Sequence, residues 1–202
     1  MDNWIERIVD QDYLKDNLTF VSLFIAVYES MTDYVVSNMQ FFLCHYCINN
    51  GKETYEQTAD YKSRIVNRVV DDKGNKDKTK ASFLWLVDYS AISQDDYNDF
   101  LCAKEIRNKY AHSLFDHLLS GVSEDDASCF LKMVSLYRKI TNWWFVNFEA
   151  EIDGDLIPEN AEVSEGISFI NILIDLIIDV LYKGKSEEYK ETVKQAINGG
   201  EP

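Results

Sequence analysis

The chain has 202 residues, enough for one domain with a sizeable hydrophobic core. Hydrophobic residues make up 46% of it, which excludes an intrinsically disordered chain. The formal net charge of −15 counts against a large non-specific DNA-binding surface, because such a surface needs many cations to neutralise phosphates. Only 8 glycines and 2 prolines are present, so the composition favours long helices.

The sequence also predicts where the protein resides. Its N-terminus is charged from the second residue and has no apolar segment before a small-residue cleavage site, so no secretory signal is expected. The longest apolar run, residues 167–181, is too short to span a bilayer and is interrupted by Asn171, Asp175 and Asp179. The four cysteines are too few for a secreted disulfide scaffold of this size. We therefore expect a cytoplasmic protein without a membrane segment.

The first half of the chain predicts helices separated by a polar loop. A short amphipathic helix is expected over residues 2–10. Residues 18–49 are almost continuously apolar and aromatic up to Asn49-Asn50-Gly51, which predicts one long helix with a C-terminal stop signal. A weaker helix is expected over residues 54–70, and the polar residues 71–80 predict a loop.

In the second half of the chain, serine residues at candidate N-cap positions predict where helices begin. Ser93, followed by two acidic residues, predicts a helix that ends near His112, after another helix over residues 80–90. Ser123 predicts a further helix to about residue 149. An acidic loop and two last helices are expected at residues 151–166, 166–182 and 187–198. Since no alternating pattern or repeat interrupts this series, we predict a single all-α domain over residues 1–202, an up-and-down bundle with shorter terminal helices.

The candidate catalytic site lies in the stretch EIRNKYAH, at the end of the helix that follows Ser93. Asn108 and His112 are four residues apart and share a face, whereas Arg107 and His112 lie about 140° apart around the axis. If the helix frays at Tyr110–Ser113, all three groups can gather around one anion. The imidazole could then move a proton at a ribose 2′-hydroxyl, while the guanidinium stabilises the phosphorane. These residues predict RNA cleavage without a metal or another cofactor.

This stretch resembles the HEPN superfamily, whose hallmark is an arginine followed by four to six residues and a histidine, often with an asparagine directly after the arginine. The resemblance extends from Phe83 to His117. It implies a helical bundle and a homodimer in which two motifs face each other. It also implies, for many members, a metal-independent endoribonuclease with an antitoxin or another protein as partner. Leu114 stands where some toxin members carry a tyrosine that a partner modifies, so that form of regulation is not implied. His117 is a possible second site group or a surface histidine.

The segment over residues 83–114 also resembles the mannitol-operon repressor family. That resemblance implies a non-catalytic regulator that acts through protein contacts. In such a protein the amide and imidazole of the motif would satisfy helix-end carbonyls, and the guanidinium would pair with Glu105 or Asp116. A third interpretation is that the arginine and histidine only complement the helix dipole.

One basic segment stands out in this acidic chain. Residues 62–80 hold seven basic and three acidic side chains, which indicates an RNA-phosphate contact or a solvated loop. The residues predicted to bind RNA are Lys62, Arg64, Arg68, Lys73 and Lys76.

Two other clusters favour structural interpretations. Cys44-His45-Tyr46-Cys47 has part of a zinc pattern, but on a helix the histidine would point away from the cysteines, so small buried residues and no metal are expected. The aromatic group Trp143, Trp144, Phe145 and Phe148 predicts a core or a dimer interface.

Overall fold

The computed structural model describes residues 4–149, Ile174 and Asp179. The chain divides into two compact units, Met1–Ile140 and Thr141–Pro202. The loop and helices predicted over residues 151–198 lie outside the described residues, apart from Ile174 and Asp179, which are helical and buried. The single domain predicted over the whole chain stays a prediction.

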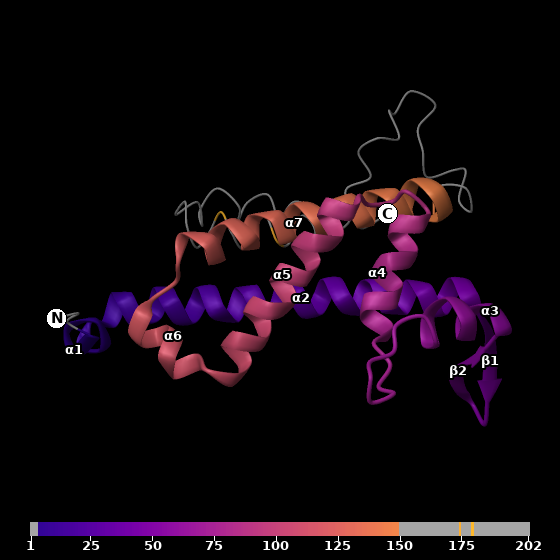
Figure 1. The fold of residues 1–202 in the computed structure, drawn as a ribbon, viewed down its shortest axis with the longest axis horizontal. Helices are drawn as coiled ribbons and strands as arrows, with labels where there is room; N and C mark the ends of the chain where they lie inside the picture. The colour runs from indigo at the N-terminus through magenta and orange to yellow at the C-terminus, as the bar shows by residue number, and fades with distance from the viewer. Residues whose placement is uncertain (1–3, 150–173, 175–178, 180–202) are drawn as a thin grey trace, which may run out of the picture. The chain divides into compact units, whose positions relative to one another are not determined.

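The described part is mostly helical, with one two-stranded sheet (Figure 1). Its elements are α1 (Trp4–Val9), α2 (Gln11–Leu43), β1 (Cys44–Asn49), β2 (Lys52–Gln57), α3 (Ala59–Tyr61), the π-helical segment η1 (Lys62–Val66), α4 (Lys78–Asp88), α5 (Gln94–His112), α6 (Leu114–Ser120), α7 (Glu124–Trp144) and the π-helical segment η2 (Phe145–Glu149).

The long helix α2 is the central helix of the first unit, against which α4 and α5 pack. Asp10 begins it, since its carboxylate accepts hydrogen bonds from the backbone N–H groups of Asp12 and Tyr13. One stripe of apolar side chains is buried along it: Phe20, Phe24, Val27, Met31, Val35 and Met39. By length and composition α2 could also cross a membrane. Burial of this stripe within the unit accounts for the same composition, because core helices are apolar for the same reason.

The prediction of one helix over residues 18–49 is wrong beyond Leu43. Residues 44–49 form β1 and pair with β2 in register, with Tyr46 opposite Tyr55. Asn50 and Gly51 form the two-residue turn, with φ of 51° and 75°. Positive φ at both positions is what a tight hairpin turn needs, and Asn-Gly adopts it at low cost. The helix predicted over residues 54–70 is likewise replaced by β2 at its start and becomes helical only from Ala59.

Helices α4 and α5 pack against α2 (Figure 1). Aromatic contacts fill the space between these elements. Phe83 of α4 stacks on Phe100 of α5 with ring centroids 3.8 Å apart, and Phe24 of α2 meets Tyr110 of α5 edge to face at 5.4 Å. These contacts fix the position of α5 against α2, and α5 carries the candidate site.

The short helix α6 was not predicted from the sequence. Its C-terminus is closed by Gly121, and the guanidinium of Arg7 on α1 donates to the carbonyl oxygen of Ser120 at 3.2 Å. The amide of Asn17 on α2 accepts from the backbone N–H of Val122 and donates to the carbonyl oxygen of Tyr13. These bonds hold the segment after α5 against α1 and α2.

In the second unit, the aromatic residues predicted as a cluster do contact one another. The rings of Trp143 and Trp144 lie 5.7 Å apart, and that of Phe148 lies 4.7 Å from Trp144. Trp144 is buried and Phe145 is half-buried. Core packing within this unit accounts for the cluster, so base stacking is not needed to explain it.

Candidate functional site

Helix α5 begins with a capping box at Ser93 and carries the Arg107–His112 motif at its C-terminal end. The Ser93 hydroxyl accepts from the backbone N–H of Asp96, and the Asp96 carboxylate accepts from the backbone N–H of Ser93. The helix continues without fraying to His112, and the N–H of Ser113 still donates to the carbonyl oxygen of Lys109. The loosening at Tyr110–Ser113, considered above as a way to free the histidine, is therefore not present.

Arg107 is held by an acid on another helix. Its Nε donates to Glu29 Oε1 on α2 at 2.6 Å, and its Nη2 forms an ion pair with the same oxygen. Its Cζ lies 5.9 Å from the ring centroid of Tyr28. Burial first, and then the neighbouring Glu29 carboxylate, raise the pKa of Tyr28 to about 12, so its phenol is neutral at physiological pH. The guanidinium thus has a fixed orientation and a paired charge, with 32% of the side chain exposed.

Asn108 connects the arginine with the face that carries the histidine. Arg107 Nη1 donates to Asn108 Oδ1 at 3.3 Å. Asn108 and His112 are both exposed, and they lie one helical turn apart on one face of α5. The long arginine side chain therefore reaches toward the amide in spite of the 140° between Arg107 and His112. In the part of the chain that the structure describes, no hydrogen bond or ion pair occupies the His112 imidazole.

His117 contacts an aromatic ring and is half-buried. Its ring meets that of Tyr110 edge to face, with centroids 4.8 Å apart. This contact explains His117 as a packing residue between α5 and α6. Neither Glu105 nor Asp116, the acids considered as partners of Arg107, occupies that role, since Glu29 does.

Both arginines predicted to bind RNA are occupied within the protein. Arg68 forms a bidentate pair with Asp88 at the end of α4, with distances of 2.6 and 3.1 Å. Arg64 donates to the hydroxyl of Tyr89 at 2.6 Å and lies 3.8 Å from Asp60. Arg64 of η1 and Arg68 just after it are thus attached to the C-terminal end of α4. A guanidinium whose donors are used within the protein has fewer left for a phosphate.

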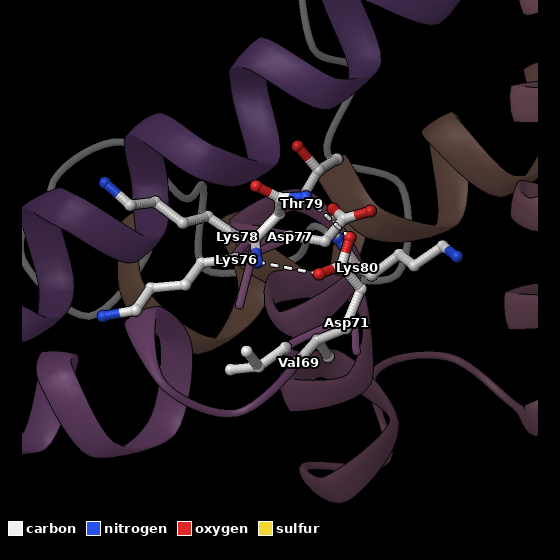
Figure 2. Close-up of a pocket in the computed structure, with 9 residues that line it drawn as sticks. Val69, Asp71, Lys76, Asp77, Lys78, Thr79 and Lys80 are labelled. Carbon is white, nitrogen blue, oxygen red and sulfur yellow. Dashed lines mark hydrogen bonds between the residues drawn. The ribbon is translucent and has the colours of Figure 1, made fainter. Parts of the chain in front are cut away.

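Three lysines of the same segment, Lys76, Lys78 and Lys80, line an open pocket of about 600 Å³. Its lining is Val69, Val70, Asp71, Asn75, Lys76, Asp77, Lys78, Thr79 and Lys80. Figure 2 shows Lys76 and Lys78 extending on one side of the pocket and Lys80 on the other. Lys62, Lys73 and Lys76 are all exposed, and Lys76 donates to Asn67 at 2.8 Å. Among the predicted RNA-binding residues, the structure brings only Lys76 into the lining of this pocket.

The acids of the pocket are already satisfied by internal contacts. Asp71 accepts from the side chain and the backbone of Asn75, and these bonds lower its pKa. Asp77 caps α4 through the N–H of Lys80 and forms an ion pair with Lys104 of α5. Partial burial acts to raise the pKa of Asp77, but the bond from Lys104 and then that from Lys80 outweigh it and lower the pKa. Both carboxylates of the pocket lining are therefore occupied by contacts within the protein.

Lys104 contacts the pocket residue Asp77 and lies on the same face of α5 as His112. Lys104, Asn108 and His112 follow one another at four-residue intervals on α5, so they form one stripe. The distance along the axis from Lys104 to His112 is about 12 Å at 1.5 Å per residue. The two regions predicted separately from sequence are thus connected through the Asp77–Lys104 ion pair.

The zinc pattern is not assembled. Cys44 and Cys47 lie on β1 rather than on a helix, and both are half-buried. Within residues 4–149, 174 and 179, no group of three or more histidine, cysteine or acidic side chains could hold a metal ion.

Sequence reasoning missed Glu29 and Lys104. An acidic residue inside a nearly apolar helix is one usable signal for Glu29, because a half-buried carboxylate needs a partner. Lys104 has a weaker signal, its four-residue spacing from Asn108 and His112.

No protein-family model matches the chain, and neither the curated proteins nor the solved structures compared with it give a significant match. The two family resemblances stated above therefore rest on the motif and its flanking residues alone.

Proposed function

We propose that the protein is a metal-independent endoribonuclease with a HEPN-like helical fold, that it works in the cytoplasm, and that two copies form its active unit. One observation carries the proposal: the guanidinium of Arg107 lies 3.3 Å from Asn108, which is one turn before the exposed His112. An arginine, an amide and an exposed imidazole at one helix end are the groups that phosphodiester cleavage by a 2′-hydroxyl needs.

Each residue has a separate role in this proposal. His112 takes the proton from the ribose 2′-hydroxyl, or gives one to the leaving 5′-oxygen. Glu29 binds Nε and Nη2 of Arg107, so Nη1, which lies 3.3 Å from Asn108 Oδ1, is the donor that stabilises the negative charge on the phosphorane, and Asn108 orients the phosphate. Since one imidazole cannot be protonated and deprotonated in the same step, a second copy of the chain would supply the other histidine. DNA would resist cleavage because it lacks the nucleophilic hydroxyl.

The lysines near α4 give the RNA strand a second contact. Lys73, Lys76, Lys78 and Lys80 lie on the loop and first turn next to Asp77, and Lys104 joins that region to the stripe that ends at His112. A strand that follows α5 would meet cations first and the imidazole about two turns later.

The alternative function is a non-catalytic regulator that binds another protein. The ion pair between Arg107 and Glu29 favours it, because it places the arginine in an internal contact between α5 and α2 that stabilises the fold. In that case the motif is structural, and His112 is only a surface residue.

Growth of bacteria that express the protein distinguishes the two functions. An active ribonuclease should slow growth, and His112→Ala should restore it at equal protein levels. His45→Ala is the matched control, because it removes an exposed histidine from β1 and should leave growth as slow as with the wild type. Equal growth for the wild type and His112→Ala would contradict a freely active nuclease and favour the regulator.

A further inference from the structure

Two ion pairs set the register between α5 and the part of α7 within the first unit. Lys139 binds Asp96, and Lys132 binds Asp99 with Nζ···Oδ1 2.9 Å. Going toward the C-terminus on α5 therefore means going toward the N-terminus on α7. The two helices are antiparallel along this contact.

Continuing in this antiparallel direction from the Asp99–Lys132 pair brings two cysteines together. Three residues beyond Asp99 on α5 is Cys102, and three residues before Lys132 on α7 is Cys129. Residues three apart on a helix share a face, so the two thiols lie on the facing sides of the helices. Burial first, and then the neighbouring Cys102 thiol, raise the pKa of Cys129 to about 12. Both thiols also influence Lys132, whose pKa is raised mainly by Asp99.

The two thiols differ in access. Cys102 is exposed, whereas Cys129 has 4% of its surface exposed. A small oxidant can thus reach Cys102 from solvent, and Cys129 lies behind it as the only neighbouring thiol among the described residues. An exposed thiol beside a sheltered second thiol is the arrangement that favours a disulfide over further oxidation of the first sulfur.

We propose that Cys102 and Cys129 form a modification site, a dithiol that a hydroperoxide converts into a disulfide between α5 and α7. The deprotonated Cys102 sulfur attacks one peroxide oxygen, the O–O bond breaks, and Cys102 becomes a sulfenic acid. The Cys129 sulfur then attacks the Cys102 sulfur, its proton is lost, and the S–OH bond breaks to release water. Two thiols lose two electrons in total, and the peroxide is reduced to water or an alcohol.

The disulfide would close a loop that contains the whole segment from Cys102 to Cys129, including His112 and α6. Its effect is to restrict how far α5 and α7 can separate, and to lower the entropy of the unfolded chain. A thiol reductant reverses it by exchange. This inference does not depend on RNA cleavage, and a protein without nuclease activity would show the same chemistry.

The experiment uses the full chain with Cys44→Ser and Cys47→Ser, so that only the proposed pair remains. The protein is treated with hydrogen peroxide, the remaining thiols are alkylated, and the peptides are analysed by mass spectrometry without reduction. We expect one linked peptide pair, lighter by two hydrogen atoms than the two reduced peptides together. We also expect a rise in Tm of about 5 °C that dithiothreitol reverses.

Adding Cys102→Ser to this background should abolish the linked pair and the rise in Tm. This variant changes an exposed residue, so it tests the proposal even if replacement of the buried Cys129 prevents folding. The proposal would be overturned by sulfinic or sulfonic acid on Cys102 with Cys129 still reduced. It would also be overturned by a disulfide between two chains on a non-reducing gel in place of the internal link.

Discussion

The carboxylate of Glu29 on α2 binds the guanidinium of Arg107 on α5, with Nε···Oε1 2.6 Å. The two residues are 78 positions apart in the chain, so this contact joins the long core helix to the helix that carries the candidate site. Tyr28, next to Glu29, stacks against Phe100 of α5 with ring centroids 6.3 Å apart. The orientation of the arginine is therefore a consequence of how the core packs.

Glu29→Gln should lower the free energy of unfolding by about 1 kcal/mol. The variant keeps the shape of the side chain and removes its charge. The effect is modest because Glu29 and Arg107 side chains are 41% and 32% exposed, where solvent screens an ion pair. Urea unfolding measures it. Glu105→Gln, an exposed acid on α5, is the control and should change stability by less than about 0.5 kcal/mol. Equal values for the two variants would show that the Glu29 contact does not stabilise the fold.

Gly121→Ala should be clearly more destabilising than Gly74→Ala. Both glycines have φ of 83°, so an alanine is strained at both positions, and Gly121 also has ψ of 170°, a conformation that glycine alone ordinarily adopts. At Gly121 the added Cβ would lie 2.6 Å from the hydroxyl oxygen of Tyr13, whereas at Gly74 it meets nothing within 4 Å. Combining Gly121→Ala with Tyr13→Phe should recover part of the loss, because the clashing oxygen is gone. Thermal unfolding of the four proteins gives the comparison, and equal losses at the two glycines would refute this account.

The sequence was informative where the signal is local. Ser93 with Asp96 forms the capping box that starts α5, and Ser123 accepts from the N–H of Asp126 at the start of α7. The helical fold class follows from such local signals together with the apolar periodicity. The finer prediction of a HEPN-like bundle needs the arrangement of all helices, which local signals do not contain.

The same local signals were misread at the hairpin. Asn49-Asn50-Gly51 ends a helix or forms a hairpin turn, and both readings use positive φ at Asn or Gly. The apolar residues before it are compatible with either a helix or a strand, since a six-residue run cannot define its period. Cross-strand pairing of Tyr46 with Tyr55 decides for the hairpin, and that contact is visible only in the structure.

The partners of the candidate site were also beyond the sequence. The acids considered for Arg107 were near it in the chain, whereas Glu29 lies on another helix. Arg68 was predicted to bind RNA, but its bidentate pair with Asp88 occupies it. Long-range ion pairs depend on tertiary packing. The sequence therefore cannot show which basic side chains are free to bind RNA and which are already paired with an acid.

Asp96→Asn should make stability less dependent on pH in the acid range. Partial burial favours the neutral form of Asp96, but bonds from Lys139 and Ser93 outweigh burial and hold the pKa of the carboxyl below its ordinary value of 3.8. Its contribution is therefore complete above that value and is lost as the pH falls through the folded-state pKa. We expect the variant to lose about 1–2 kcal/mol at pH 7, and the difference from the wild type to shrink below about pH 4.

Urea unfolding between pH 2.5 and 7 measures this effect, and Asp95→Asn is the control. Asp95 is an exposed acid in the same first turn of α5. If the two variants lost equal stability at every pH, the bonds to Asp96 would not be the source of the dependence.

Lys73→Ala with Lys76→Ala should weaken RNA binding and its dependence on salt. Each lysine that neutralises a phosphate adds about 0.7 to the slope of log K against log salt for a single strand, so the double variant should lose about 1.4. Lys15→Ala with Lys52→Ala removes the same charge from exposed positions elsewhere and is the control. Arg68→Ala should reduce stability and leave the slope unchanged, because its guanidinium is bound to Asp88. A slope unaffected by the first pair would place the RNA contact elsewhere.

The most direct test of the central claim is cleavage of RNA by the purified protein in the presence of EDTA, with the product ends identified. Attack by the 2′-hydroxyl leaves a 2′,3′-cyclic phosphate and a 5′-hydroxyl, and DNA of the same sequence should stay intact. We predict that His112→Ala slows cleavage at least about 100-fold, as loss of a general acid or base does, while His45→Ala cleaves like the wild type. Cleavage at the same rate by His112→Ala, or products with other ends, would contradict the assignment of this motif as a nuclease site.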